Sequence, residues 1–313
     1  MAYDVIGDIH GCSQSLTSLL DRLEYKRDTG GVFRHAKRKA VFLGDFIDRG
    51  PFQREVLDVV RPMIENDCAL AVMGNHEFNA IAYHTQDPDT GSYLRPHTDK
   101  NTRQHQAFLD AYGADARERA EVVEWFNTLP LWLDLDDFRV VHACWDKHCM
   151  QKIQDMRGGS NLLSEALLRA GSQSGTWQYA ALETLLKGKE IPLKPGLSFK
   201  DKDGHTRHHI RIRWWDQAAT SYRSIYMGPE SARSSIPDDD VEGDHLVEYG
   251  HAEPPCFLGH YWMEGQPGLL APNIACLDFS VAKPGGKLVA YRWDGERTLS
   301  SNKFVWVDRK EEG

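Results

Sequence analysis

Three short stretches in the first 77 residues place polar side chains directly after apolar runs. They read Gly7-Asp8-Ile9-His10-Gly11, Gly44-Asp45-Phe46-Ile47-Asp48-Arg49-Gly50 and Gly74-Asn75-His76-Glu77. The runs before them have the length of short buried strands. In α/β sheets, the chemistry gathers at the carboxyl ends of the strands. We therefore expect the polar residues of the three stretches to lie close together.

Two later histidines, His142 and His260, also follow apolar runs. Carboxylate and amide oxygens combined with imidazole nitrogens suit a first-row divalent ion such as manganese, iron or zinc, whereas calcium takes oxygens almost alone. The candidate ligands are Asp8, His10, Asp45, Asn75, His142 and His260. Six ligands are too many for one ion that keeps an open position. They suit two ions about 3.5–4 Å apart that share a carboxylate, a geometry used for in-line attack at phosphorus.

Strand and helix patterns alternate over the same part of the chain. Leucines at 16, 19, 20 and 23 form one face of a helix after the first strand, and Ser13 is its expected N-cap. A second helix follows Pro51, and Pro62 is expected to kink or shorten it. A strand at 69–73 comes next. This order predicts a layered α/β fold with crossover connections.

The rest of the chain is expected to complete a single domain over residues 1–313. A polar loop at 84–103 leads to two helices and then to a hairpin that ends at His142. Residues from about 146 to 250 are the least regular, and we interpret them as a cap inserted over the metal-bearing end. Core-like strands are expected at 256–260, 274–277, 287–293 and 304–307.

Composition argues against several classes of protein. A net charge of −9 disfavours a protein that binds nucleic acid through a basic surface, so no stable nucleic-acid complex is expected. The chain has no run of 18 apolar residues and no signal-peptide pattern, so no membrane association is expected. Six scattered cysteines are typical of free thiols in a reducing compartment, and we expect a cytoplasmic protein.

The three early motifs, together with Val141-His142-Ala143 and Gly259-His260, resemble those of the calcineurin-like metallophosphoesterases. The intact Asp48-Arg49-Gly50 and the Asn-His-Glu ending resemble the serine/threonine phosphoprotein-phosphatase branch in particular. Leu277-Asp278 and the glycine-rich stretch at 285–288 resemble the closing strands of bacterial members, including symmetrical diadenosine-tetraphosphate hydrolases. The resemblance implies a two-sheet β-sandwich flanked by helices. It also implies a metal-dependent phosphoric ester hydrolase.

Carried onto this sequence, the resemblance implies two metal ions and their ligands. Asp8 and His10 would hold one ion, Asn75, His142 and His260 the other, and Asp45 would bridge them. Manganese is the expected metal, with iron and zinc as alternatives. A metal-bound hydroxide would then attack phosphorus in line.

The resemblance also implies roles for residues around the metals. His76 would protonate the leaving oxygen, Asp48 would orient the His76 imidazole, and Arg49 would clamp phosphate oxygens. A second phosphate-binding arginine is expected between the two late histidines. Arg211 and Arg213 are the candidates, and the sequence does not distinguish them. The remaining histidines, including His84 and His105, are expected to be surface or core residues without a ligand role.

Three functions follow as hypotheses. The first is hydrolysis of phosphate monoesters, including phosphoserine or phosphothreonine in proteins. The second is hydrolysis of a phosphoanhydride in dinucleoside tetraphosphates, and the third is a catalytically inactive binding module. Asp48 and Glu77 favour the first, because the resembling tetraphosphate hydrolases often lack the former and have aspartate for the latter. Glu77 itself either supports the site or only begins a helix.

Overall fold

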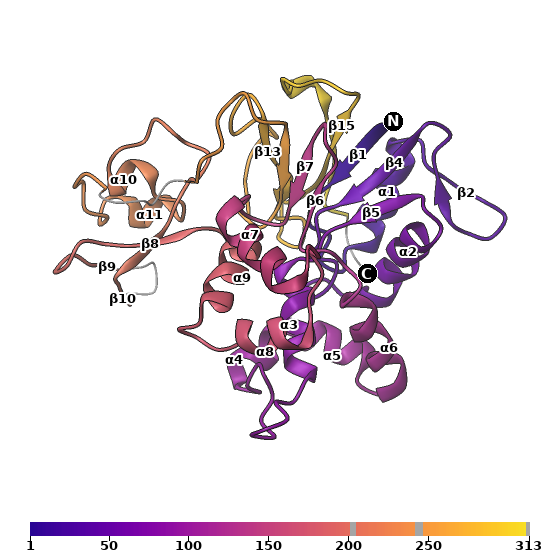
Figure 1. Ribbon diagram of the computed structural model, residues 1–313. Helices are drawn as coiled ribbons and strands as arrows, with labels where there is room; N and C mark the ends of the chain where they lie inside the picture. The colour runs from indigo at the N-terminus through magenta and orange to yellow at the C-terminus, as the bar shows by residue number, and fades with distance from the viewer. Residues whose placement is uncertain (201–204, 242–246, 311–313) are drawn as a thin grey trace.

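The computed structural model describes residues 1–200, 205–241 and 247–310, and two β-sheets lie side by side at its centre (Figure 1). The larger sheet has the strand order β14-β15-β1-β4-β5, and β16 also pairs with β15. Its strands are β1 (Ala2–Ile6), β4 (Arg38–Phe42), β5 (Ala69–Ala71), β14 (Asp278–Phe279), β15 (Lys287–Trp293) and β16 (Phe304–Asp308). The smaller sheet has the order β13-β12-β7-β6. Its strands are β6 (Trp132–Asp134), β7 (Arg139–Val141), β12 (Cys256–Leu258) and β13 (Ile274–Cys276).

The two sheets form a sandwich because their strands alternate between two hydrophobic clusters. Val5 of β1, Val41 of β4 and Phe257 of β12 belong to a cluster that joins the two sheets. The neighbouring residues Ile6 and Phe42 belong to the larger cluster, which also contains the helices. Side chains of a strand point alternately to its two faces, so both faces of each sheet are covered. The predicted two-sheet α/β sandwich is confirmed.

Crossover helices connect the parallel strands of the larger sheet. β1, β4 and β5 run parallel, and α1 (Ser13–Arg22) and α2 (Gln53–Glu65) lie between them in sequence. Ser13 is not the N-cap of α1 as predicted: Cys12 holds that position, and Ser13 is the first helical residue. Pro62 does not end α2, which continues to Glu65. Pro62 lies near the helix end, so little of the helix follows it.

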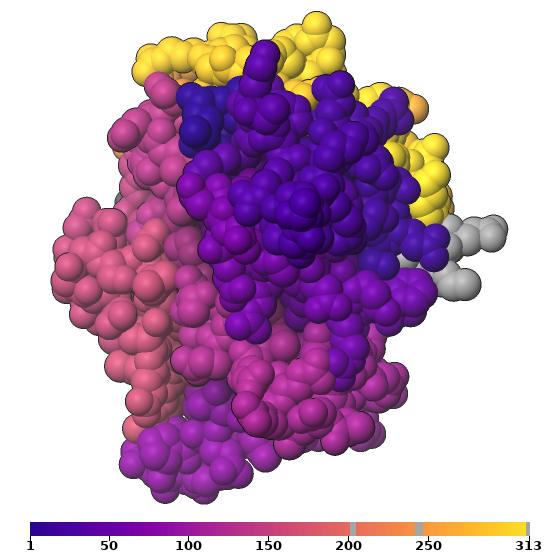
Figure 2. Space-filling model, turned by 90° about the vertical axis from the view of Figure 1, so that its right-hand side faces the viewer, coloured from indigo at the N-terminus to yellow at the C-terminus, as the bar shows by residue number. Residues whose placement is uncertain are grey.

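Four helices follow β5 along the chain and precede β6, and they lie near the carboxyl ends of the strands. They are α3 (Asn75–His84), α4 (Asp99–Gln104), α5 (Gln106–Tyr112) and α6 (Ala116–Phe126). Figure 2 shows the face built mainly from the first third of the chain, with the C-terminal strands along its upper edge. Within the described residues, no helix combines the length and apolar character that crossing a bilayer requires.

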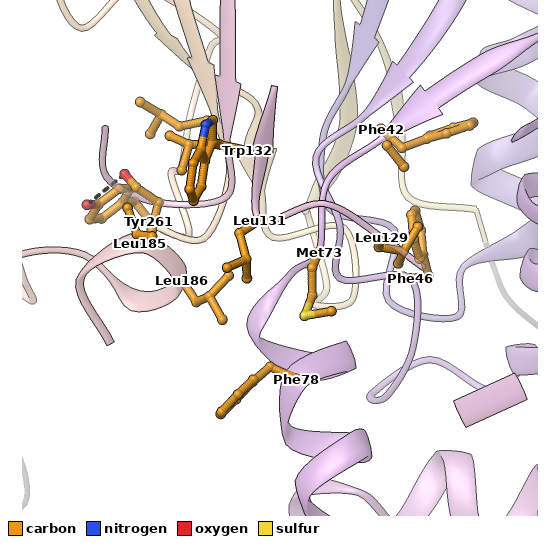
Figure 3. Packing of buried hydrophobic residues seen from close by; sticks show 14 of the residues in the cluster. Phe42, Phe46, Met73, Phe78, Leu129, Leu131, Trp132, Leu185, Leu186 and Tyr261 are labelled. Atoms are coloured by element: carbon orange, nitrogen blue, oxygen red, sulfur yellow. Dashed lines mark hydrogen bonds between the residues drawn. The ribbon is translucent and has the colours of Figure 1, made fainter. Parts of the chain in front are cut away.

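The 146–250 segment divides into two parts, and its residues 201–204 and 242–246 lie outside the described residues. The first part holds α7 (Lys147–Arg157), α8 (Glu165–Gly171) and α9 (Trp177–Lys187); α7 was not expected. Leu185 and Leu186 of α9 lie beside Leu131 and Tyr261, so this part packs onto the main core (Figure 3).

The second part of this segment projects to one side of the sandwich (Figure 1). It holds short elements only: β8 (Glu190–Pro192), β9 (Phe199–Lys200), β10 (Thr206–Arg207), β11 (His209–Arg211), α10 (Tyr222–Ile225) and α11 (Glu230–Arg233). Trp214 and Trp215 are both buried here, and the indole Nε1 of Trp214 donates to the carbonyl of Ala143 at 3.1 Å. These two aromatic rings therefore pack the segment against the core.

Candidate metal centre

The six predicted ligands gather where strands of both sheets end. The loops after β1, β4 and β5 carry Asp8, His10, Asp45 and Asn75, and the loops after β7 and β12 carry His142 and His260. Five of these side chains are buried, and His260 is half-buried. The expected meeting of distant motifs at one edge of the fold is therefore observed.

Asp45 lies at the middle of the cluster. Its Oδ2 is 3.4 Å from His142 Nε2 and 3.6 Å from His10 Nε2. Its Oδ1 accepts a hydrogen bond from the backbone N–H of His76 at 2.9 Å. Burial alone would raise the pKa of Asp45, but His142 and His76 outweigh it and hold that pKa well below its usual range. One carboxylate oxygen thus faces two imidazole nitrogens on different elements.

Backbone carbonyls fix the ring orientation of two histidines. His10 Nδ1 lies 3.0 Å from the carbonyl oxygen of Ile47, and His142 Nδ1 lies 2.7 Å from that of Leu43. A carbonyl only accepts, so each Nδ1 carries a proton, and each Nε2 faces Asp45. Burial and the nearby Arg49 lower the pKa of His10 to about 3, which keeps that ring neutral. Burial would lower the pKa of His142, but Asp45 outweighs it and raises that pKa to about 10, so a divalent ion would take the place of the proton on its Nε2. Rings held in a fixed orientation in this way are suited to hold a metal.

Asn75, His260 and Asp8 complete the cluster. Asn75 Oδ1 is 2.8 Å from His260 Nδ1 and 3.2 Å from His142 Nε2. Asp8 Oδ2 accepts from the backbone N–H of His260 at 3.0 Å, so residues 252 positions apart in sequence are joined. A Cβ on Gly259 would lie 2.0 Å from Asp8 Oδ1, so glycine is required for this close approach.

The buried polar atoms of the cluster fit bound cations. Asp8 Oδ1 and His10 Nε2 are both buried without a hydrogen-bond partner, and an unpaired buried polar atom is costly. Two sets of three side chains bring their ligand atoms within 4.8 Å of one another: His10, Asp45 and His76, and Asp45, His142 and His260. Asp45 belongs to both sets. These donors could hold two divalent ions that share its carboxylate.

Backbone strain is concentrated at the same place. Ten non-glycine residues have positive φ within the described chain, and six of them lie at this centre: His10, Asp45, Asp48, Arg49, His260 and Trp262. Left-handed backbone is unfavourable for non-glycine residues and accumulates at functional sites. The fold therefore accepts unfavourable backbone conformations at these residues, and these conformations direct their side chains toward the site.

Glu77 supports the centre from behind and also lies in the first turn of α3. Its Oε2 accepts from the backbone N–H groups of Asp45 and Gly74, at 2.8 and 2.9 Å, and its Oε1 accepts from Phe46 at 2.8 Å. Its side chain is fully buried. Of the two expected roles, support of the site and helix initiation, the residue fulfils both.

Replacing Glu77 with glutamine is expected to lower the free energy of unfolding by about 1–3 kcal/mol, because the amide NH₂ would face a buried N–H donor. Urea unfolding followed by circular dichroism measures this loss. Glu55→Gln is the matched control, since Glu55 occupies the same position in the first turn of α2 but is exposed. Equal stability of the two variants would contradict this role of Glu77.

His76 and Asp48 form a buried pair beside the cluster. His76 Nδ1 is 2.6 Å from Asp48 Oδ2, and the two side chains are 8 % and 2 % exposed. Burial lowers the pKa of His76, but Asp45 and Asp48 outweigh that effect and raise it above its ordinary value. Asp48 thus orients the ring, and the Nε2 atom of His76 faces the cluster 4.0 Å from Asp45 Oδ2.

Two residues around Asp48 were not foreseen. His105, between α4 and α5, places its Nδ1 2.9 Å from Asp48 Oδ1. Gln53, the first residue of α2, accepts from the backbone N–H of Asp48 at 2.6 Å. Neither His105 nor Gln53 belongs to a recognisable motif, so the sequence alone does not predict their contacts with Asp48.

Arg49 and Trp262 lie at the mouth of the site. The Arg49 guanidinium carbon is 4.3 Å from the centroid of the Trp262 ring, and the Lys283 ammonium is 4.5 Å from the same ring. The indole is 44 % exposed. Arg49 Nη2 also lies 3.4 Å from His76 Nε2. The stacking of the guanidinium on the ring holds Arg49 next to His76.

The two candidate arginines of the 146–250 segment are placed differently. Arg211 lines the site, with Nη1 3.3 Å from His260 Nε2, and its Nη2 pairs with Glu190 at 3.4 Å. Arg213 donates to the carbonyl of Ser224 and pairs with Asp216 at 3.3 Å. Of the two, only Arg211 is brought to the metal cluster.

A cavity of about 980 Å³ opens over the centre. Seven basic residues line it: Arg49, Arg95, Lys100, Arg103, Lys187, Arg211 and Lys283. The acidic residues in its lining are Asp48, which is buried, and Asp110. A chain with a net charge of −9 therefore has a strongly cationic cavity at its candidate site.

Two curated relatives with similar sequences are bis(5'-nucleosyl)-tetraphosphatases. An asymmetrical bis(5'-nucleosyl)-tetraphosphatase PrpE of Halalkalibacterium halodurans is 41 % identical over 76 residues, which are 24 % of this chain and 31 % of that relative. The chain thus spans about a third of that relative's length. A symmetrical bis(5'-nucleosyl)-tetraphosphatase of Vibrio parahaemolyticus is 26 % identical over 96 % of this chain and 99 % of its own length.

A solved structure of a protein serine/threonine phosphatase from Saccharomyces cerevisiae shares the fold. It has a TM-score of 0.54 and 14 % identity, over 100 % of this chain and 81 % of that one. The family model of the calcineurin-like phosphoesterases matches residues 1–266, a range that contains all six candidate ligands. This family consists of hydrolases, and its dimetal chemistry suits the donor set described above. The protein is therefore an enzyme that belongs to the calcineurin-like phosphoesterase family.

Proposed function

We propose that the protein hydrolyses phosphorylated substrates with two divalent metal ions and that His76 protonates the leaving oxygen. The observation that carries this proposal is the adjacency of the His76–Asp48 pair to a cluster whose donors lack partners. A metal-binding module without catalytic activity would need the unpaired ligand atoms, but it would not need an oriented imidazole beside them. An acid next to a metal cluster indicates catalysis.

We assign the ligands as the sequence predicts. Asp8 and His10 serve one ion, Asn75, His142 and His260 serve the other, and Asp45 serves both. Mixed nitrogen and oxygen donors suit manganese, with iron and zinc as alternatives. Two such ions, when bound, lower the pKa of water and neutralise charge on the phosphoryl group.

The protein's own side chains then position the substrate and move one proton. Arg49 and Arg211 bind non-bridging phosphate oxygens through planar guanidinium groups. As the oxygen of a water molecule bonds to phosphorus and releases its proton to solvent, the bond between phosphorus and the leaving oxygen breaks. The electron pair of the broken bond stays on the leaving oxygen, and His76 Nε2–H donates a proton to it. Asp48 holds the opposite nitrogen of the ring throughout.

The two arginines provide a matched test. Arg211→Gln is expected to raise the KM for a phosphorylated substrate about tenfold, because a guanidinium bonded to a phosphate is worth about 1.5–3 kcal/mol. Arg213→Gln should leave KM unchanged, because this side chain is bonded to Ser224 and Asp216. Initial-rate kinetics of the two variants decide the assignment; a larger effect at Arg213 would reverse it.

The cavity favours a substrate with several phosphates. Seven basic side chains exceed what one phosphate needs, and 980 Å³ is large enough for a nucleotide-sized molecule. Arg95 is bonded to the amides of Asn79 and Gln104, at 3.0 and 2.8 Å, rather than to a carboxylate within the described chain. Its charge is therefore available to an anion. Together with the tetraphosphatases named above, this supports a dinucleoside polyphosphate as the substrate.

A phosphate monoester is the second candidate substrate. The oriented His76 favours it, because an alkoxide leaving group needs protonation more than a nucleotide leaving group does. The ratio of kcat/KM for diadenosine tetraphosphate to that for a phosphoserine peptide separates the two, with manganese-loaded protein. A ratio far above one supports the polyphosphate, and a ratio below one supports the monoester.

Neutralising the cavity wall sharpens this comparison. Arg95→Gln and Lys100→Gln should lower kcat/KM for diadenosine tetraphosphate more than for the phosphopeptide. Both side chains line the cavity, and neither is a candidate metal ligand, so their charges serve the additional phosphates of the longer substrate. Lys39→Gln is the control, since Lys39 pairs with Asp67 and does not line the cavity.

The 146–250 segment supplies part of this cavity, and we propose that it acts as a cap within a single catalytic domain. Lys187, at the end of α9, and Arg211, in β11, both line the cavity. The backbone N–H of Ala143 donates to the carbonyl of Leu185 in α9 at 2.9 Å, next to His142. This contact anchors α9 to the loop that carries a candidate ligand.

A further inference from the structure

The Asp48 carboxylate is shared by two buried imidazoles. His76 Nδ1 lies 2.6 Å from Oδ2, and His105 Nδ1 lies 2.9 Å from Oδ1. His105 is 4 % exposed, as buried as the pair that it extends. The catalytic function proposed for His76 uses only the first of these contacts and leaves the second unexplained.

Chemistry determines the direction of both hydrogen bonds. Burial would raise the pKa of Asp48, but hydrogen bonds from His105 and His76 lower it to about 2, so the carboxylate is ionised and only accepts. Both Nδ1 atoms therefore donate. The Nε2 atom of His105 lies 3.3 Å from the Nε2 atom of His84.

The His105 ring is itself held in place. It stacks on Phe108 with centroids 4.7 Å apart and planes 17° apart, and it also contacts Tyr83. His105 is the single residue between α4 and α5, so its backbone is held by a helix on each side. The ring is thus a rigid donor aimed at the carboxylate oxygen that His76 does not use.

We propose that His105 is a positioning residue that fixes the rotation of the Asp48 carboxylate and, through it, the aim of the His76 ring. The terminal torsion of an aspartate is soft, so a carboxylate bonded at one oxygen can turn. Bonding both oxygens removes this freedom, because any rotation stretches both hydrogen bonds. The inference rests on the proposed function, since it requires His76 to be the acid.

Two conservative variants separate the nitrogen atoms of His105. In His105→Asn, the amide nitrogen can take the place of Nδ1 and bond Asp48. In His105→Gln, it reaches the place of Nε2 and faces His84. His105→Leu removes both ring nitrogen atoms at similar volume. His97→Leu is the matched control, because His97 also contacts Tyr83 but is exposed and bonds its carbonyl rather than Asp48.

The readout is the dependence of rate on the leaving group. An acid matters for phenyl phosphate, which releases a basic oxygen, and hardly matters for 2,4-dinitrophenyl phosphate. The ratio of kcat/KM for these two esters within one preparation is independent of the fraction of folded enzyme. We expect the kcat/KM for phenyl phosphate, divided by that for 2,4-dinitrophenyl phosphate, to fall about tenfold in the Gln and Leu variants. This fall is a part of the rate that a general acid contributes. The ratio should be unchanged in the Asn variant and in His97→Leu.

An unchanged ratio in the Gln and Leu variants would overturn the proposal, and so would an equal fall in the Asn variant. If the Leu variant does not fold, the Asn and Gln variants decide alone. If the wild-type enzyme hydrolyses neither ester, the proposed function fails for monoesters, and the inference is decided by nuclear magnetic resonance.

That second measurement uses zinc-loaded, ¹⁵N-histidine-labelled protein. The Nδ1–H signal of His76 should be protected from exchange with water in the wild type and the Asn variant. It should broaden in the Gln variant, where the carboxylate is free to turn. A His76 signal that stays sharp in the Gln variant would contradict the positioning role even without any activity.

Discussion

Asp45→Asn is expected to abolish binding of at least one metal ion and to lower kcat by more than about a thousandfold, since electrostatic stabilisation of the reacting phosphate is lost with the ions. Asn keeps an oxygen that can accept from the His76 N–H, and it tolerates the φ of +52° at this position. What it lacks is the Oδ2 oxygen, which faces both His10 and His142. Metal content by elemental analysis and kcat are the measurements.

The control for this variant shares its backbone geometry. Asp67 has a φ of +56° and pairs with Lys39 far from the cluster, so Asp67→Asn should keep two ions and full activity. An Asp45→Asn enzyme that still binds two ions and turns over normally would refute the shared-ligand role of Asp45.

His76→Ala is expected to keep both metal ions and to lose about 10²–10⁴ in kcat, which is the usual contribution of a general acid. The distinction matters because His76 also lies within reach of a ligand set with His10 and Asp45. If His76 were a ligand, its removal would lower the metal content as well as the rate. Elemental analysis beside kinetics therefore separates acid from ligand.

His97→Ala serves as the comparison, since this histidine is exposed and its Nε2 bonds the carbonyl of Tyr83 at 2.8 Å. It should match the wild type in both measurements. A His76→Ala enzyme with near-normal kcat on a poor leaving group would show that another group supplies the proton.

The meeting of the candidate ligands was predictable from sequence because each of them follows its own strand within a short motif. Asp8, Asp45 and Asn75 needed only the rule that parallel strands end at one edge. The same alternation of strand and helix patterns predicted a layered α/β fold with crossover connections. The two-sheet arrangement was implied only by the resemblance of the motifs to a known family, and the strand order, which depends on pairing between distant segments, was not predicted.

The surroundings of Asp48 were not predictable, because they depend on packing between distant elements. His105 lies 57 residues from Asp48 and reaches it only because α4 packs on α5, and α5 packs on α2 and α6. Arg211 and Arg213 are two residues apart, and only the course of the chain after β11 distinguishes them. Helix α7 was missed because it buries only Met150 and Ile153, although Asp146 caps it.

The ligands of this centre come from both sheets, and this gives bound ions a second effect besides chemistry. An ion held by Asp45 and Asn75 after strands of the larger sheet, and by His142 and His260 after strands of the smaller sheet, would tie the two halves of the sandwich together. An ion that binds only the folded chain adds to its stability, by about 2.7 kcal/mol when its free concentration is a hundredfold above its dissociation constant. Removing the ions would therefore lower the free energy of unfolding of the chain as well as its activity.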